Sequence, residues 1–414
     1  MPIHPSRRAF FQRLTAAAAY PAMAQALAAA ASDDAYWQVI RQQFPFGEDK
    51  VPMNAANLCP SPLAVSQRVT EVTRDIDVDC SFQNRLKFKE SLETSRSRVA
   101  EMLRVDKDEI ALVRNTSESN NIINAGLPLG AADEVVVWDQ NHPTNNVAWD
   151  VRAKRYGLQV KRVSTPAAPK NVNDLIRPFE KAISAKTKVL TVTHASNVSG
   201  IRLPVKKLAA LAHAKGIHFH VDGAQTWGAL DVNLRDLDCD SYSASAHKWF
   251  VGPKEVGLLY VRKERIEHIW PSIVAPGWGT GAATELVGAR KFESMGQRDD
   301  AALSAVGATA EFHATVGGSR TQKRVFELAK RLMAGLSRIG AQLTTPQSAE
   351  LSAGVVIMDV PTANRQALVD AMYAEHGIAG STSGGFRLCP HLYNTYEHVD
   401  RAVEGLKALK RLWA

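Results

Sequence analysis

Residues 188–225 read KVLTVTHASNVSGIRLPVKKLAALAHAKGIHFHVDGAQ, and their pattern decides the fold. Two runs, at 188–196 and 218–225, are β-rich and predict strands. Between them, LPVKKLAALAHAKG (203–216) carries apolar residues at i, i+3, i+4 and i+7, the period of an amphipathic helix. A strand, a helix and a second strand in this order form a βαβ unit, whose two strands lie parallel in one sheet.

Three more β-rich runs extend this pattern: EVVVWD at 134–139, DSYSASAHK at 240–248 and VGLLYVR at 256–262. The alternation predicts an α/β fold with a largely parallel sheet and helices on both faces. In such sheets, ligands bind beyond the carboxyl ends of the strands. Polar residues that end these runs are therefore the candidate site residues.

Composition limits the classes of function. The 414 residues are 45% hydrophobic and 22% charged, as in a globular protein with one large core and a smaller second domain. The net charge of +8 is not gathered into Lys/Arg runs with interleaved aromatic residues, so we expect no nucleic-acid binding. Four scattered cysteines predict neither a disulfide framework nor a metal site.

The first 31 residues suggest a targeting signal. Arg7 and Arg8 precede an apolar pair and the Ala-rich stretch TAAAAYPAMAQALAAAA, which resembles a twin-arginine export signal. We expect residues 1–31 to be a signal peptide, cleaved after Ala26 or Ala31, and the mature protein to be periplasmic or secreted without a membrane span. The alternative is an alanine-rich helical extension with no targeting role.

Polar residues follow an apparent strand that ends at Asn115, and others stand in the predicted strand at 218–225. In VRNTSESNNIINAG (113–126), Thr116 and Ser117 stand at the start of a helix, where free backbone N–H groups suit a phosphate, although both residues are also ordinary N-caps. In HVDGAQTWG (220–228), Asp222 ends an apolar run. A buried aspartate needs a cationic or hydrogen-bonding partner, and its alternative role is to cap the next helix.

Lys248 lies in SASAHKWFVGP (243–253), at a junction of strand and loop. Desolvation there disfavours the ammonium form and leaves an amine that can attack a carbonyl carbon. Ser245 and His247 flank it with donors for an anion. By composition alone, a solvated surface lysine is the commoner case.

Together these stretches carry a resemblance. TSE (116–118), THASNVSGIRLPV (193–205), HVDGAQTWGALDV (220–232) and SASAHKWFVGPKEVGLLYV (243–261) resemble the successive motifs of the class V aminotransferase family, nearest its isopenicillin N epimerase-like branch. The resemblance implies a pyridoxal-phosphate enzyme of fold type I and a homodimer. It also implies a large cofactor-binding domain over 66–290, a small α/β domain over 291–414 and an N-terminal arm over 32–65 that joins the small domain.

The resemblance also implies roles for single residues. Lys248 forms the Schiff base with pyridoxal 5′-phosphate and Asp222 pairs with its pyridine nitrogen, while Arg387 in FRLCPHLYNTYEHVD (386–400) binds the substrate carboxylate. The resemblance implies that the phosphate is held by Thr116, Ser117, Ser245 and His247. Asn197 and Gln225 lie near the phenolic oxygen of the cofactor. His142 stacks on the ring, with Pro143 as the alternative for this role. Gln297, in a segment that reaches the partner subunit, replaces a threonine of many relatives. VPMNAANLCPSP (51–62) either lines the substrate site or only packs there.

The reaction stays open at this point. The expected substrate is an amino acid, and aminotransferase or epimerase chemistry at its α-carbon is the first interpretation. A carbon–sulfur lyase or cysteine desulfurase is the alternative, but a desulfurase needs a mobile thiol, and HGIAGSTSGGFRL (376–388) contains none. Cys389 follows in an expected strand, as a packed thiol. A binding module that has lost the cofactor is a remote alternative.

Overall fold

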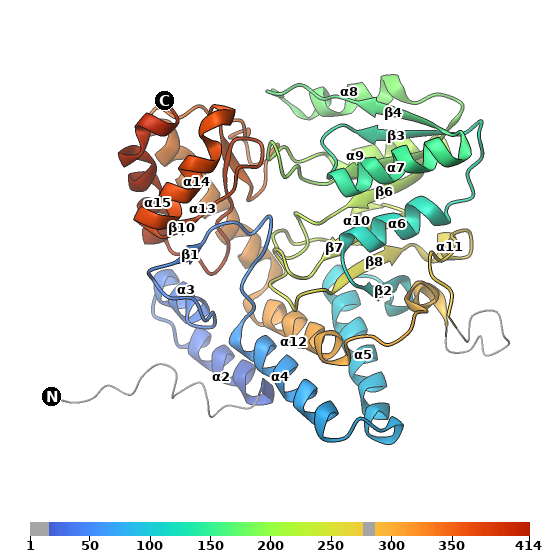
Figure 1. Cartoon of the computed structure of the whole chain (residues 1–414), viewed down its shortest axis with the longest axis horizontal. Helices are drawn as coiled ribbons and strands as arrows, with labels where there is room; N and C mark the ends of the chain where they lie inside the picture. The colour runs from blue at the N-terminus through green and yellow to red at the C-terminus, as the bar shows by residue number, and fades with distance from the viewer. Residues whose placement is uncertain (1–15, 276–285) are drawn as a thin grey trace.

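The structure is a computed structural model that describes residues 16–275 and 286–414, so Arg7, Arg8 and Arg13 lie outside the described residues. Its main sheet has the strand order β2-β8-β7-β6-β5-β3-β4 (Figure 1). The strands are β2 Ile110–Val113, β3 Glu134–Trp138, β4 Gln159–Val163, β5 Thr187–Thr193, β6 His218–Asp222, β7 Ser241–Ser245 and β8 Gly257–Val261. Strands β4, β3, β5, β6 and β7 pair in parallel, and β8 is antiparallel to both its neighbours.

The fold predicted from the sequence is confirmed. All five predicted strands are present, and the predicted helix is α9, Val205–His213. The observed strands stop short of the predicted ends, because the polar residues that follow them belong to loops at the carboxyl edge.

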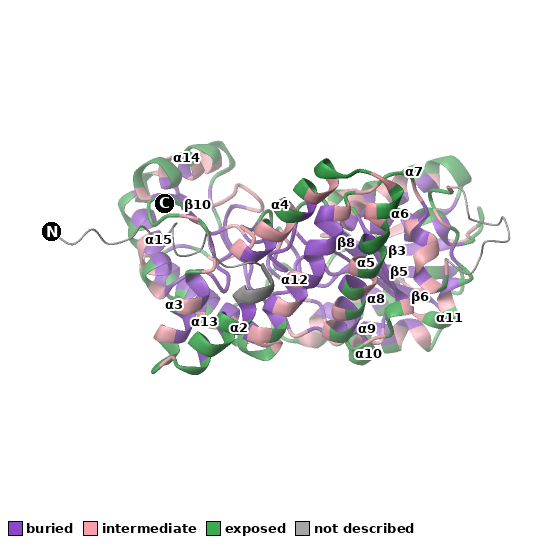
Figure 2. Ribbon diagram, turned by 90° about the horizontal axis from the view of Figure 1, so that it is seen from below, coloured by how far each residue is buried: buried purple, intermediate pink, exposed green. Residues whose placement is uncertain are grey.

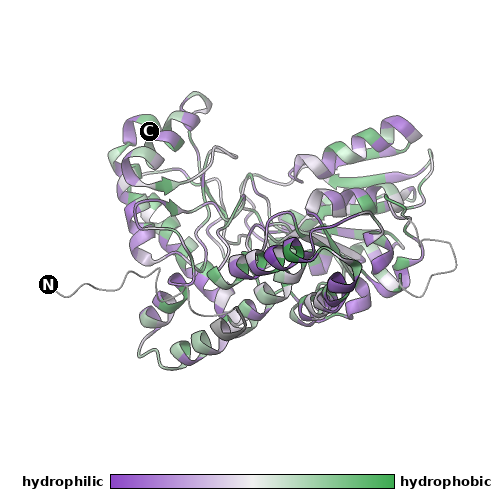
Figure 3. Cartoon of the chain, turned by 60° about the horizontal axis from the view of Figure 1, so that its bottom comes forward, coloured by the Kyte–Doolittle hydropathy of each residue, from purple (hydrophilic) through white to green (hydrophobic). Residues whose placement is uncertain are grey.

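Helices cover both faces of the sheet, because alternate residues of its strands point to opposite sides. On one face, Val135 and Leu259 pack in a core with helices α6 and α7, and on the other Val136 and Leu258 pack in a core with α5, α8 and α9. The buried strands lie between exposed helix surfaces (Figure 2), and the covering helices carry both hydrophilic and hydrophobic residues (Figure 3). The bounds are α5 Phe82–Leu103, α6 Thr116–Gly126, α7 Pro143–Tyr156, α8 Val172–Ala182 and α9 Val205–His213.

The C-terminal part builds a second, smaller core. Strand β9 (Val356–Met358) pairs antiparallel with β11 (Phe386–Leu388), and β1 (Val51–Pro52) of the N-terminal arm pairs in parallel with β10 (Ile378–Ala379). Its helices are α13 Gly318–Arg338, α14 Arg365–His376 and α15 Tyr396–Ala408. Two short helices, α10 Leu234–Leu237 and α11 Lys263–Ile266, lie in the large domain.

The N-terminal helices pack beside this core. They are α2 Ala16–Ala28, α3 Asp33–Arg41 and α4 Leu63–Val78, and α12 (Asp300–Val316) lies against α2, α4 and α5. Tyr20, Met23 and Leu27 of α2 are buried in a cluster that includes Phe312 of α12. Helix α2, part of the expected signal peptide, therefore packs on the fold through Tyr20, Met23 and Leu27. Within residues 16–275 and 286–414, no helix is both long and apolar enough to cross a bilayer.

Candidate active site

The first polar strand end meets the start of α6. Asn115 caps this helix and accepts a hydrogen bond from the Glu118 N–H at 3.1 Å. The Thr116 N–H donates to Ser245 Oγ at 2.8 Å, and the two hydroxyls of Thr116 and Ser245 are 2.6 Å apart. The hydroxyls of Thr116 and Ser245 at the start of α6, with half-buried Ser117 next along the chain, form a site suited to a phosphate.

Lys248 follows β7 in the next loop and is half-buried. Burial lowers its pKa most strongly, while the charge of Asp222 raises this pKa and that of Arg387 lowers it. These effects require the three charged groups to lie close together, as the motif order predicted. The lowered pKa favours a neutral amine, which is the nucleophilic form.

Asp222 ends β6 and is 1% exposed. Its Oδ2 accepts a hydrogen bond from Asn120 Nδ2 at 2.9 Å, and its Oδ1 accepts one from the Ala224 N–H at 3.0 Å. The second bond is a contact within the turn and not the helix cap that was the alternative role of Asp222, because the next helix, α10, begins at Leu234. The first comes from α6, a partner that the sequence patterns did not identify.

Arg387 lies on β11 and is only 3% exposed. Its Nη1 donates to the Asn197 carbonyl and its Nη2 to Asn54 Oδ1, both at 2.9 Å. Among residues 16–275 and 286–414 it forms no ion pair, and its Nε has no hydrogen-bond partner. A buried guanidinium with unused donors is suited to a carboxylate ligand.

His142 caps α7 and is half-buried, whereas Pro143 is the exposed first residue of that helix. Burial lowers the pKa of His142, the charges of Lys248 and Arg387 lower it further, and that of Asp222 raises it. All three charged groups therefore lie near the His142 ring.

The remaining predicted residues occupy varied positions. Gln225 is buried, donating to the Ala56 carbonyl at 3.1 Å and accepting from Trp249 Nε1 at 2.8 Å. Burial, then Lys248 and Lys254, lower the pKa of His247 to about 4, so its imidazole is neutral at pH 7. Gln297 is exposed and accepts a hydrogen bond from Arg85 at 2.8 Å.

The N-terminal arm joins the site at several points. Besides Asn54 and Ala56, the Cys59 N–H donates to the His247 carbonyl at 2.8 Å. The segment 51–62 thus contacts the motifs of Gln225, His247 and Arg387. Sequence reasoning left its role open and missed Asn54, because an asparagine in a loop carries no periodic signal.

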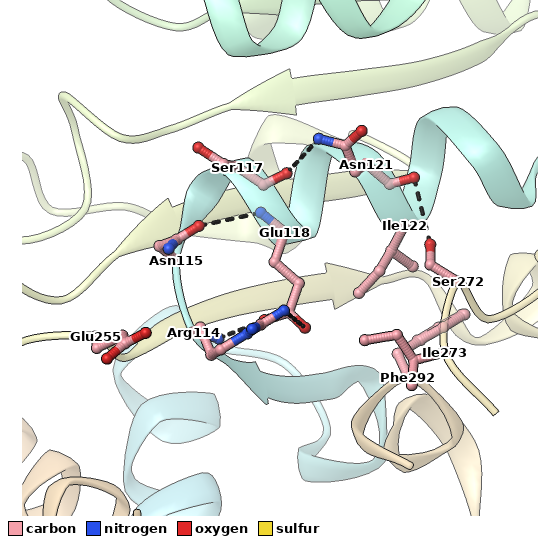
Figure 4. A pocket seen from close by; sticks show the side chains of 10 residues that line it. All are labelled: Arg114, Asn115, Ser117, Glu118, Asn121, Ile122, Glu255, Ser272, Ile273 and Phe292. Atoms are coloured by element: carbon pink, nitrogen blue, oxygen red, sulfur yellow. Dashed lines mark hydrogen bonds and ion pairs between the residues drawn. The ribbon is translucent and has the colours of Figure 1, made fainter. Parts of the chain in front are cut away.

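A cleft with a volume of about 400 Å³ lies beside the start of α6 (Figure 4). Its walls come from α6, from the strand-end residues before it and from the 272–273 and Phe292 segments. The side chains are Arg114, Asn115, Ser117, Glu118, Asn121, Ile122, Glu255, Ser272, Ile273 and Phe292. The cleft includes Ser117 but not Lys248, so it adjoins the phosphate end of the candidate site rather than its amine.

The cysteines are mostly buried. Cys59, Cys239 and Cys389 are buried and Cys80 is exposed. Burial raises the pKa of Cys59 to about 12 and also raises that of Cys389. A thiol that stays protonated is a poor nucleophile. Within the described part of the chain, no cluster of side chains is arranged to hold a metal ion.

Comparison with known proteins agrees with this geometry. Residues 61–401 match the family model Aminotransferase class-V. Isopenicillin N epimerase of Streptomyces clavuligerus is 28% identical over 392 residues, which cover 90% of this chain and 98% of the relative. A probable cysteine desulfurase of Methanothermobacter thermautotrophicus is 30% identical over 310 residues, 72% of this chain and 76% of the relative.

Solved structures share the fold. The apo cysteine desulfurase of Thermococcus onnurineus NA1 superposes with a TM-score of 0.81 at 22% identity, covering 90% of this chain and 98% of that one. The cystine C–S lyase C-DES, in complex with cysteine persulfide, superposes with a TM-score of 0.79 at 21% identity over 87% of this chain and 97% of that one. The resemblance of the motifs, the mostly parallel sheet and the family match agree. The chain therefore belongs to the class V aminotransferase family of pyridoxal 5′-phosphate-dependent enzymes.

Proposed function

We propose that the protein moves a proton at the α-carbon of an amino acid, as an aminotransferase or an isopenicillin N epimerase-like enzyme. The observation that carries the proposal is the Lys248 amine, whose pKa is lowered by burial beside Asp222 and Arg387. A neutral amine can accept the α-proton and return it. The epimerase of Streptomyces clavuligerus supports this branch, because the match covers 98% of its length.

The donor set fits pyridoxal 5′-phosphate at each functional group. The Lys248 amine suits the aldehyde, the buried Asp222 carboxylate suits a protonated ring nitrogen, and the Thr116 and Ser245 hydroxyls at the start of α6 suit the phosphate. Ser117 and His247 add further phosphate donors in this proposal. When bound, the cofactor supplies an electron-accepting ring that makes the α-proton of the substrate easier to remove.

The chain's own residues then have distinct tasks. Arg387 holds the substrate carboxylate with its unused donors, and Asn54 fixes the guanidinium. With the cofactor bound, His142 would form a face of its pocket, and Gln225 and Asn197 would be the residues available to its phenolic oxygen. Lys248 Nζ accepts the α-proton on one face of the substrate. Epimerisation then requires a proton on the opposite face of the same carbon, supplied by a second acid or by water, whereas transamination places a proton on another atom.

The second candidate is carbon–sulfur bond cleavage, which the relatives named as probable cysteine desulfurases support. The buried, protonated thiols of Cys59 and Cys389 weigh against the desulfurase form, because that reaction needs a mobile nucleophilic thiol. A lyase that eliminates sulfur needs no thiol of its own.

The decisive experiment incubates the purified holoprotein with a panel of L- and D-amino acids in deuterium oxide. We expect deuterium at the α-carbon, together with either the opposite enantiomer or, with a 2-oxo acid present, a new amino acid. Release of pyruvate and ammonia with sulfide from cysteine, or with cysteine persulfide from cystine, identifies the second candidate instead. Substitution Lys248→Ala should remove the cofactor's visible absorbance band and the exchange. A Lys248→Ala variant that keeps both would show that the site is wrongly assigned.

We also propose export by a twin-arginine signal over residues 1–31 and assembly into a homodimer. The dimer proposal is supported by large exposed apolar side chains at two places, Val78 and Phe82 at the α4–α5 turn and Trp270 and Val274 near the cleft. Cell fractionation with N-terminal sequencing tests export, and an intact N-terminus in the cytoplasm would contradict it. Light scattering tests the dimer, and a monomer at micromolar concentration would contradict it.

A further inference from the structure

The centre of the main sheet carries an unusual polar face. Strands β6 and β7 lie in the middle of the sheet, yet each places a polar residue at every second position. The residues that face α6 in this way are His218, His220, Asp222, Ser241, Ser243 and Ser245, all of them buried. On the same face, the flanking strands β5 and β8 supply the apolar Val189, Leu259 and Val261, and β5 adds the polar Thr191 and Thr193. Buried polar groups are costly unless they are hydrogen-bonded, so this face calls for an explanation.

Five of these residues, all but Ser245, form with Asn120 of α6 a continuous hydrogen-bonded chain that ends at Asp222. Asn120 Nδ2 donates to Asp222 Oδ2 at 2.9 Å, and Asn120 Oδ1 lies 2.9 Å from His220 Nε2 and 2.5 Å from Ser243 Oγ. His220 Nδ1 is 2.8 Å from Ser241 Oγ, and that oxygen is 2.9 Å from His218 Nε2. The chain runs the length of β6, from its first residue to its last.

The direction of every bond follows from the carboxylate. Asp222 can only accept, so Asn120 must turn its NH₂ group to it and its carbonyl oxygen to His220 and Ser243. His220 therefore carries its proton on Nε2, and its unprotonated Nδ1 accepts from the Ser241 hydroxyl. Burial lowers the pKa of His220 to about 3, in agreement with a neutral ring at pH 7. Ser241 in turn accepts from His218 Nε2.

We propose that Asn120 and His220 are positioning residues, which hold the Asp222 carboxylate in the orientation that binds the ring nitrogen of the cofactor. The inference rests on the proposed role of Asp222. Because Asn120 engages one side of Oδ2 and the Ala224 N–H engages Oδ1, the carboxylate cannot rotate without breaking a buried bond. Hydrogen bonds in a chain polarise and strengthen one another in a low-dielectric interior. The bond from His220 to Asn120 therefore strengthens the bond from Asn120 to Asp222.

A purely structural role makes a different prediction. If the chain only satisfies buried polar groups, its loss lowers the stability of the apo protein and weakens binding of any cofactor analogue equally. If it positions Asp222, the loss is specific to ligands with a ring nitrogen. The two probes are therefore pyridoxal 5′-phosphate and its 1-deaza analogue, in which CH replaces that nitrogen.

The experiment measures the affinity of apo protein for both probes by quenching of tryptophan fluorescence, and thermal unfolding of the apo protein alongside. The variants are Asn120→Leu, His220→Leu, His220→Gln and Asp222→Asn, with His398→Leu as control, since His398 is a buried histidine bonded to Glu48 in the small domain. Glutamine keeps a donor near the position of Nε2, so it should rescue what leucine loses.

We expect Asn120→Leu to weaken pyridoxal 5′-phosphate binding by about 10- to 100-fold, the cost of a lost buried hydrogen bond to a charged group, and to leave the deaza analogue nearly unchanged. His220→Leu should give a smaller loss of the same kind, and His220→Gln should recover most of it. The control should keep the wild-type preference between the probes.

The outcomes separate the two assignments. A wild-type preference in Asp222→Asn would overturn the role of Asp222 itself. Loss of preference in Asp222→Asn, with full preference in Asn120→Leu and His220→Leu, would overturn the positioning role alone. If Asn120→Leu does not fold, the comparison of His220→Leu with His220→Gln tests the positioning role. Equal affinities of these two variants for pyridoxal 5′-phosphate would overturn the proposal.

Discussion

The proposed contact of Arg387 with the substrate carboxylate gives the sharpest quantitative prediction. The guanidinium is 3% exposed and is held by Asn54 Oδ1 and the Asn197 carbonyl, each at 2.9 Å. Truncation of one partner in a buried charged pair costs about 2–5 kcal/mol. At 1.4 kcal/mol per factor of ten, Arg387→Ala should weaken amino-acid binding by about 30-fold to about 4,000-fold.

Asn54 contributes to the same contact indirectly. Asn54→Ala removes one hydrogen bond to a charged donor, and the remaining donor reaches water, so we expect a cost of about 1–2 kcal/mol, or about 5- to 30-fold weaker binding. Because Asn54 acts through Arg387, the two substitutions should not be additive. The double variant Asn54→Ala with Arg387→Ala should bind amino acids as weakly as Arg387→Ala alone.

The assay is a titration of the holoprotein with amino acids, followed by the change in cofactor absorbance, and in parallel the KM for whichever reaction is found. The matched control is Asn57→Ala, an exposed residue of the same arm, which should leave binding unchanged. Amine analogues that lack the carboxylate should bind all variants equally. Unchanged amino-acid affinity in Arg387→Ala, or full additivity in the double variant, would refute the reasoning.

Three further predictions concern stability. Burial lowers the pKa of His313 to about 4, so the stability that its neutral ring contributes is complete above the unfolded pKa of 6.5 and falls as the pH drops toward 4. In urea titrations at several pH values, His313→Phe should reduce the pH slope of the unfolding free energy in this range by up to about 1.4 kcal/mol per pH unit. An unchanged slope would contradict this prediction. A Cβ at Gly223 would lie 1.8 Å from the Tyr242 ring, so Gly223→Ala should lower the thermal midpoint sharply, whereas Gly296→Ala, with open space around it, should not. Removal of residues 1–31 takes away the buried side chains of α2 and should lower the unfolding free energy by about 2–5 kcal/mol, measured by urea denaturation; equal stability would show that the helix packs without stabilising the fold.

The sequence predicts the sheet and the order of the site motifs along the chain, because both depend on local patterns. The period-2 and period-3.6 runs identify β5, α9 and β6, and the carboxyl ends of parallel strands bring Asp222 and Lys248 to one edge. Residues that act across long separations leave no such pattern. Asn120 meets Asp222 over 102 positions and Asn54 meets Arg387 over 333, so only the folded chain brings each pair together.

The export-like segment shows another limit. Its composition resembles a signal that is removed, and on that basis it was expected to lie outside the fold. With residues 1–31 still attached, Tyr20, Met23 and Leu27 pack with apolar side chains of α12, because an alanine-rich helix with a few large residues can also pack on a core. Composition alone therefore does not distinguish an export signal from a helix that packs on the fold before any cleavage.

The polar face of β6 and β7 has a more general consequence. Alternation of polar and apolar residues, as in HFHVD and SYSAS, is the ordinary pattern of a strand with one face in water. The βαβ order of this chain forces both strands into the middle of a sheet covered on both faces, where that interpretation fails. The alternate residues must then find partners inside the protein, and here they form a chain of donors that ends at the carboxylate of Asp222. An alternating strand that the topology places at the centre of a parallel sheet is thus a signal for a buried functional network, and it can be read from sequence once the fold is known.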